Sequence, residues 1–326
     1  MFSEDVLARL SQVNRKRPPV EDIRGDIAPC PSPALDLRFH PAAEEDVSQL
    51  PPGEEMSTAW GTHWVRRQPL SRLWPQSARW LSHHLRPQES PAKHMPTRSR
   101  DLRLLLAHLP DQVVYLDLET CGFAGSMVFL VGLIHWHCDD LQLTQIMARN
   151  YAEEKSMLQA LWSIVARHPI LVTFNGKSFD WPMVHDRSTV HRLGRDLRSV
   201  TRKKPEAFPE ANMSAAELLA LDDPRPEPLH CDLLHLARRR WKRKLPNCKL
   251  QTLERYICRR RRTNDIPGHE IPAAYHDFVR SGDAWLMRGV LHHNALDLVT
   301  LLQLSLLLLP SPAEQTSATQ KRAASR

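Results

Sequence analysis

Asp117 and Glu119 are the first residues in this sequence whose types and spacing suggest chemistry. They lie in the apolar segment 113–119, whose β-branched and aromatic residues predict a strand. Because side chains alternate along a strand, both carboxylates would share one face. Bound Mg²⁺ or Mn²⁺, which prefer oxygen ligands, would explain two acids on a face that points inward. An isolated pair of this kind is more often only an exposed strand face.

Asp180 ends a second motif, N-G-K-S-F-D at residues 175–180. The motif directly follows a short apolar segment, 170–174, that predicts a buried strand. Ligands of α/β sheets bind beyond the carboxyl ends of such strands. The motif also offers Asn175 and Lys177 as candidate contacts to nucleic acid. By itself, an aspartate at this place more often only caps the next helix.

A third motif, from His292 to Asp297, opens an apolar segment that predicts a helix. Histidine can take a proton from water near neutral pH, so His292 or His293 could act as a general base beside Asp297. Residues four apart on a helix are offset by about 40° and residues five apart by about 140°. His293 therefore shares the face of Asp297 if the helix already includes it. His292 could reach the same place only from a turn before the helix.

The three motifs together favour a single site over three unrelated ones. Two divalent ions about 4 Å apart can clamp the attacking and leaving oxygens of a phosphodiester. A single carboxylate could not balance the charge of two such ions, whereas four could. We therefore predict two Mg²⁺ or Mn²⁺ ions held by four residues: Asp117, Glu119, Asp180 and Asp297.

The elements that must position these residues can be predicted from hydrophobic spacing. Strands are expected at 113–119, 128–136, 141–147 and 170–174, with a helix at 153–167 before the last of them. This order resembles the beginning of a ribonuclease H-like sheet. Helices are expected further on, at 229–241, 250–257, 283–290 and 294–309. The predicted fold class is α/β, a ribonuclease H-like mixed sheet flanked by helices.

The domain organisation follows from composition. Residues 1–55 are charged and proline-rich and predict a weakly ordered segment, and 56–111 predict a small extension rich in Trp, Arg and Pro. The main domain is expected at 112–309, with a proline-rich insertion at 189–228, and a disordered tail at 310–326.

At these motifs the sequence resembles the DEDD (DnaQ-like) 3′–5′ exonuclease superfamily, and more closely its YprB-like ribonuclease H-like branch. The resemblance covers about residues 112–308 and includes the segments 230–235, 250–254 and 265–272. It implies metal-dependent hydrolysis of DNA or RNA, from the 3′ end. The alternative is a nucleic-acid-binding module that keeps the fold without turnover. A missing carboxylate would support that alternative, and none of the four is missing.

The resemblance bears on the base as well. Members of the superfamily differ in whether a His five residues, or a Tyr four residues, precedes the last Asp. In this sequence His292 lies five residues and His293 four residues before Asp297. The segment His293-Asn294 matches the YprB-like pattern more closely, so we expect His293 to be the base and keep His292 as the alternative.

The charge of the chain suits a polyanionic partner. Its formal net charge is +7. The densest basic stretch predicts contacts to nucleic-acid phosphates through Arg238, Arg239, Arg240 and Lys242, and Arg259–Arg262 is a second basic run. Trp241, inside the first stretch, could either stack on a base or pack inward. No signal-peptide pattern and no span long enough for a bilayer are recognised, so a cytoplasmic protein without a membrane partner is expected.

Overall fold

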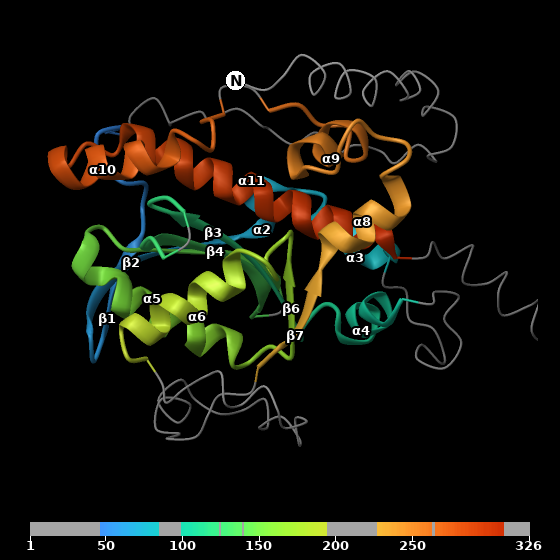
Figure 1. Cartoon of the computed structure of the whole chain (residues 1–326), viewed down its shortest axis with the longest axis horizontal. Coiled ribbons are helices and arrows are strands. Elements are labelled where there is room, and N and C mark those ends of the chain that lie inside the picture. The colour runs from blue at the N-terminus through green and yellow to red at the C-terminus, as the bar shows by residue number, and fades with distance from the viewer. Residues whose placement is uncertain are drawn as a thin grey trace, which may run out of the picture.

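One mixed sheet of seven strands organises the chain in this computed structural model, which describes residues 46–84, 99–123, 125–138, 140–193, 227–262 and 265–309. The strand order is β1-β2-β5-β4-β3-β6-β7. Helices cover both faces of the sheet (Figure 1). The predicted mixed sheet flanked by helices is therefore confirmed.

The centre of the sheet contains the strands that the sequence predicts. β3 (Val113–Thr120), β4 (Val128–His137) and β5 (Asp140–Met147) pair antiparallel, and β6 (Ile170–Thr173) runs parallel to β3. β7 (Leu229–Asp232) then pairs parallel to β6. A hairpin of β1 (Glu54–Thr58) and β2 (Gly61–Pro69) extends the sheet beyond β5. Part of the expected N-terminal extension thus supplies two strands of the same sheet.

The helices divide between the two faces of the sheet and its ends (Figure 1). The N-terminal part has α2 (Leu70–Leu73), α3 (Ser77–His84) and α4 (Arg100–His108). The middle part has the short 3-10 helix η2 (Tyr151–Glu153), α5 (Glu154–Val165) and α6 (Asp180–Val190). The C-terminal part has α8 (Leu233–Trp241), α9 (Leu250–Tyr256), α10 (Ile271–Ser281) and α11 (Trp285–Leu308).

The alternation of β3 determines which helix its side chains meet. Val114 and Leu116 pack in the core that includes α5, whereas Val113 and Tyr115 pack in the core that includes α11. The Tyr115 hydroxyl also lies 2.8 Å from Ser305 Oγ on α11. Residue 117 continues the series of Val113 and Tyr115. The sheet therefore directs its acidic pair toward α11 and away from α5.

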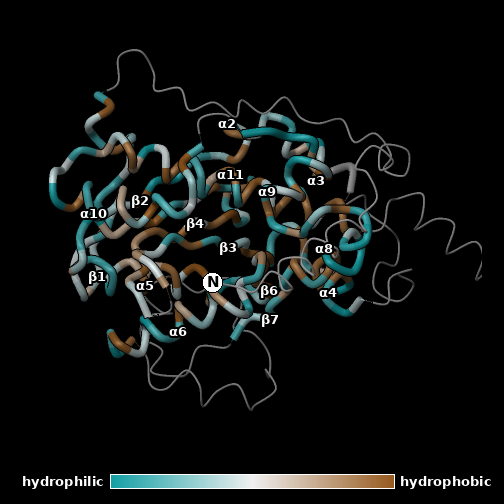
Figure 2. The backbone as a smooth tube through the Cα atoms, turned by 45° about the horizontal axis from the view of Figure 1, so that its top comes forward, coloured by the Kyte–Doolittle hydropathy of each residue, from teal (hydrophilic) through white to brown (hydrophobic). Residues whose placement is uncertain are grey.

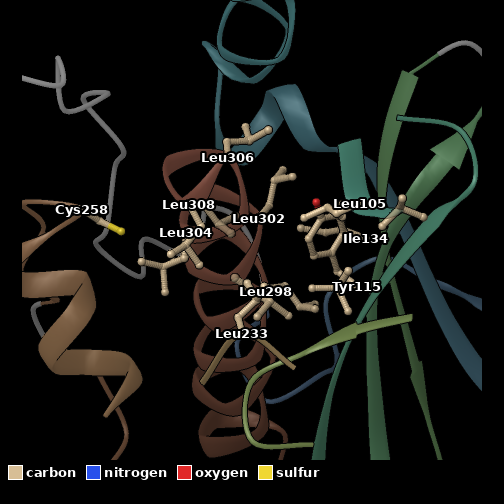
Figure 3. Close-up of a cluster of buried hydrophobic side chains, with 14 of the residues drawn as sticks. Leu105, Tyr115, Ile134, Leu233, Cys258, Leu298, Leu302, Leu304, Leu306 and Leu308 are labelled. Carbon is tan, nitrogen blue, oxygen red and sulfur yellow. The ribbon is translucent and has the colours of Figure 1, made fainter. Parts of the chain in front are cut away.

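α11 is the central helix of the core on that face. Leu298 and Leu302 extend from it toward Tyr115 and Ile134 on the sheet (Figure 3), and hydrophobic segments gather where it crosses the central strands (Figure 2). By length and composition alone α11 resembles a membrane-spanning helix, but 83% of its most apolar window is buried inside the protein. The core helix of a soluble protein has the same composition.

Two predictions of secondary structure were wrong. The expected helices 283–290 and 294–309 are one continuous helix, because no glycine or proline interrupts residues 290–295 and both ends bury apolar side chains. The expected helix 229–241 begins instead with β7, since those first four residues complete the ladder beside β6. The predicted insertion at 189–228 lies mostly outside the described residues, as do most of the segment 1–55 and all of the tail 310–326.

Candidate active site

The four predicted metal ligands lie on three elements that are far apart in the sequence. Asp117 and Glu119 lie on β3, Asp180 is the first residue of α6, and Asp297 lies in the middle of α11. Desolvation raises the pKa of Asp117 well above its usual value, and the negative charges of the other three carboxylates raise it further. These electrostatic effects on one side chain indicate that all four share one acidic site.

The site holds more buried negative charge than its protein neighbours neutralise. Desolvation raises the pKa of Glu119 to about 8, and that of Asp180 to about 7. Other carboxylates of the site contribute to both shifts. Within the described part of the chain, no side chain donates a hydrogen bond to either carboxylate. An oxygen-only donor set of this kind suits Mg²⁺ or Mn²⁺.

Asp297 differs from the other three carboxylates because two basic side chains contact it. Its Oδ1 accepts a hydrogen bond from Arg262 Nη2, and its Oδ2 lies 3.4 Å from His293 Nε2. Desolvation would raise the pKa of Asp297, but Arg262 and His293 hold it below its usual value. Among the described residues, no three His, Cys, Asp or Glu side chains are arranged closely enough to hold a metal ion. The donor types therefore fit the predicted metals, whereas Asp297 is engaged by cationic side chains.

His293 and His292 both lie inside α11, which begins at Trp285. His293 shares the face of Asp297, as a spacing of four residues requires, and its Nδ1 lies 2.9 Å from Asp265 Oδ1. Desolvation would lower the pKa of His293, but its hydrogen bonds to Asp265 and Asp297 raise it to about 11. His292 is half-buried and lies within the helix, not in a turn before it. The structure thus gives His293 the contact with Asp297.

Asn294 connects α11 to the acidic strand. Its Nδ2 donates to Asp117 Oδ2 at 2.9 Å, and its Oδ1 accepts from Gln145 Nε2 on β5 at 3.2 Å. Between these two strands lies Gly132 of β4, where an added Cβ would come within 2.0 Å of Asn294 Oδ1. The missing side chain at Gly132 therefore allows Asn294 to reach Asp117.

The loop that carries Asp180 is fixed by Asp232 at the end of β7. The buried carboxylate of Asp232 accepts hydrogen bonds from the backbone N–H of Asn175 at 2.8 Å and of Lys177 at 3.2 Å. It also accepts from Leu234 N at 3.0 Å and so caps α8. Asn175 adopts a left-handed φ of 67°, which asparagine tolerates better than most residues. The half-buried Asn175 and the exposed Lys177 thus lie on an ordered loop beside the site.

We expect Asp232→Ala to lower the free energy of unfolding by about 2–4 kcal/mol, because it leaves buried backbone donors without an acceptor. Asp277→Ala is the matched control: Asp277 is exposed and pairs with exposed Arg280, so the cost there should be under about 0.5 kcal/mol. Urea unfolding followed by circular dichroism measures both. Equal effects of the two substitutions would contradict the role assigned to Asp232.

The predicted basic contacts divide into exposed and buried side chains. Exposed positions at the end of α8 are Arg238, Arg239, Arg240 and Lys242. Of the two possibilities for Trp241, the structure has the inward one and not the contact with nucleic acid: its side chain is only 5% exposed and packs in the core with α11. In the second basic run, Arg260 and Arg262 also point inward, where Glu254 lies close to both.

Sequence reasoning did not assign a role to four residues of the site: Asn294, Arg262, Asp265 and Glu254. Arg262 belongs to the second basic run, and a run of four arginines does not show which of them turns inward. Glu254 carried a signal for the inward position of Arg262. It is an acid at a buried position of the short helix α9, next to buried Leu253. Such an acid requires a basic partner, and Arg262 Nε donates to it at 2.8 Å.

Comparison with known proteins gives two similarities. A family model described as RNase_H superfamily matches residues 114–309, a range that includes all four carboxylates. The chain is also 32% identical over 197 residues to a protein of Bacillus subtilis (strain 168) described as uncharacterized protein YprB. The aligned segment covers 60% of this chain and 41% of that protein, so the match spans less than half of the relative's length.

Proposed function

The chain belongs to the RNase H superfamily, and on that premise we propose that it is a metal-dependent nuclease that removes nucleotides from the 3′ end of DNA or RNA. Membership indicates a nuclease or a nucleic-acid-related function. The finer proposal, a DEDD-type exonuclease with two metal ions, rests mainly on one observation. The negative charges of Glu119, Asp180 and Asp297 all act on Asp117, and Asp297 lies 3.4 Å from His293.

In this proposal Asp117, Glu119, Asp180 and Asp297 hold Mg²⁺ or Mn²⁺. When bound, these ions lower the pKa of the attacking water and stabilise charge on the leaving 3′ oxygen. Asn294 orients Asp117 through its 2.9 Å hydrogen bond, and Asp232 orients Asp180 through the loop at 175–177. His293 Nε2 accepts the proton of the attacking water, while Asp265 holds its Nδ1.

Exposed basic and aromatic side chains support a nucleic-acid substrate. The exposed basic positions on α8 would contact backbone phosphates without regard to sequence. Phe123 follows β3 and is 95% exposed, and Phe179 directly precedes Asp180 and is 65% exposed. Exposed aromatic rings beside a nuclease site can stack on unpaired bases. We therefore expect single-stranded ends to be preferred over blunt duplex ends.

The experiment that tests this function is a panel of end-labelled single- and double-stranded DNA and RNA, incubated with Mg²⁺, Mn²⁺ or EDTA. We expect ladders that shorten from the 3′ end with either metal and no cleavage with EDTA. A 5′ label and a 3′ label on the same strand distinguish the direction of cleavage from internal cutting.

One outcome would replace the proposal with its alternative. Binding in gel-shift assays without cleavage under any metal would indicate a nucleic-acid-binding module that keeps the fold. The engagement of Asp297 by Arg262 is the observation that favours this alternative. The panel therefore includes both a binding and a cleavage measurement on every substrate.

A further inference from the structure

Arg262 occupies an unusual place for a basic residue of a nuclease. Its side chain is 7% exposed, and all three of its guanidinium nitrogens contact carboxylates. Nε donates to Glu254 at 2.8 Å, Nη1 to Asp265 at 3.2 Å, and Nη2 pairs with Asp297. Glu254 is itself buried. The guanidinium of Arg262 is thus held by three carboxylates, and one of them is Asp297, a candidate metal ligand.

Both oxygens of Asp297 are engaged in this arrangement. Arg262 contacts Oδ1, and His293 lies near Oδ2. A divalent ion that binds Asp297 needs one of these oxygens, and its charge would repel a guanidinium held on the same carboxylate. The other three carboxylates, on β3 and α6, have no arginine contact among the described residues. Metal binding at Asp297 and the present position of Arg262 therefore oppose each other.

We propose that Arg262 acts as a placeholder for the second metal ion, so that Asp297 becomes available only when a nucleic-acid phosphate draws Arg262 away. This inference rests on the proposed function. A phosphodiester accepts two parallel hydrogen bonds from a guanidinium, as a carboxylate does, and it can replace Asp297 as the partner of Arg262. Substrate and second metal then bind cooperatively, and each raises the affinity for the other by the same factor.

Electron paramagnetic resonance of Mn²⁺ tests the inference without measuring cleavage, because free and protein-bound Mn²⁺ can be counted. The EDTA-dialysed chain is titrated with Mn²⁺, with and without a single-stranded phosphorothioate oligonucleotide that resists hydrolysis. We expect one bound Mn²⁺ per chain without the oligonucleotide and two with it. Arg262→Gln should bind two in both conditions. Arg280→Gln, which removes an exposed arginine paired with an aspartate, should behave as the unmodified chain.

The outcomes separate this inference from the proposed function. Two Mn²⁺ ions bound by the unmodified chain without oligonucleotide would refute the placeholder role and leave the metal site intact. One ion bound by Arg262→Gln in both conditions would refute it as well. No binding by any chain would overturn the proposed function and the inference together.

The comparison also holds if Arg262→Gln does not fold, as judged by circular dichroism. The unmodified chain with and without oligonucleotide then decides the question. Arg262→Lys adds a second test, because lysine keeps the charge but lacks the planar fork of donors and so should hold Asp297 less firmly. Its affinity for the second Mn²⁺ without oligonucleotide should exceed that of the unmodified chain by about tenfold, within the usual range of coupling between sites.

Discussion

Asp117→Asn should reduce hydrolysis by about 10⁴-fold, equivalent to about 5.5 kcal/mol of transition-state stabilisation, while binding of nucleic acid stays largely intact. The negative charges of the other three carboxylates all act on Asp117. Its loss should therefore affect any ion that the site holds. Asparagine keeps the shape of the side chain, and its amide oxygen can still accept from Asn294. Initial rates on an end-labelled single strand, together with fluorescence anisotropy for binding, measure the two properties separately.

Stability provides the control for this variant. The substitution removes one of several mutually repelling buried charges, so the free energy of unfolding should remain equal or rise. A stable, binding-competent and inactive variant would identify Asp117 as part of the chemistry. Asp277→Asn, on the exposed face of α10, should leave cleavage unchanged. Cleavage that survives both EDTA and Asp117→Asn would show that the active site lies elsewhere.

His293→Ala should reduce turnover by about 10²–10⁴-fold, the usual contribution of a general base, whereas His292→Ala should cost far less. The structure supplies the reason, because His293 lies 3.4 Å from Asp297 and His292 is offset around α11. The neighbouring carboxylates raise the pKa of His293 to about 11, so without bound cations its imidazole carries the proton at neutral pH. Its action as a base therefore requires that bound metal first neutralise those carboxylates.

Rates for both variants across pH 6 to 9 with saturating metal decide between the histidines. If His293→Ala cleaves at the unmodified rate and His292→Ala cleaves much more slowly, the assignment of the base is reversed. If both variants cleave at the unmodified rate, neither histidine is the base. Unfolding curves of each variant show whether a loss of rate reflects a loss of structure instead.

The central elements could be predicted because their signals are local. β3, β4 and β5 are long runs with strong strand composition, and α5 shows regular helical spacing. β7 could not be predicted, because four residues that could begin a helix form a strand only when β6 lies beside them. The hairpin β1–β2 was missed for the same reason: its position depends on pairing with β5, far away in the sequence.

In the candidate site too, residues with local sequence signals could be predicted and residues that depend on distant partners could not. The acids of β3, α6 and α11 were identified from short motifs, and in the structure the charges of the other three act on Asp117. The residues that hold those acids were not identified, because Asn294, Arg262 and Asp265 act only through partners distant in sequence. Trp241 shows how a local pattern can suggest a contact that the fold does not make. An aromatic residue within a basic run suggested stacking on a base, but its position on α8 directs its side chain toward the core.

The contact between Gly132 and Asn294 has a consequence for how sequences of this family vary. With Asn294 Oδ1 only 2.0 Å from the place of a Cβ, a larger residue at position 132 would force the side chain of Asn294 out of its present position. Substitutions at the two positions should therefore be inherited as a pair, and a chain with alanine at 132 should carry a smaller residue at 294. Such a chain would also lose the hydrogen bond to Asp117. The glycine of β4 would thus mark, in an alignment, which relatives keep the acidic strand oriented for chemistry and which keep only the fold.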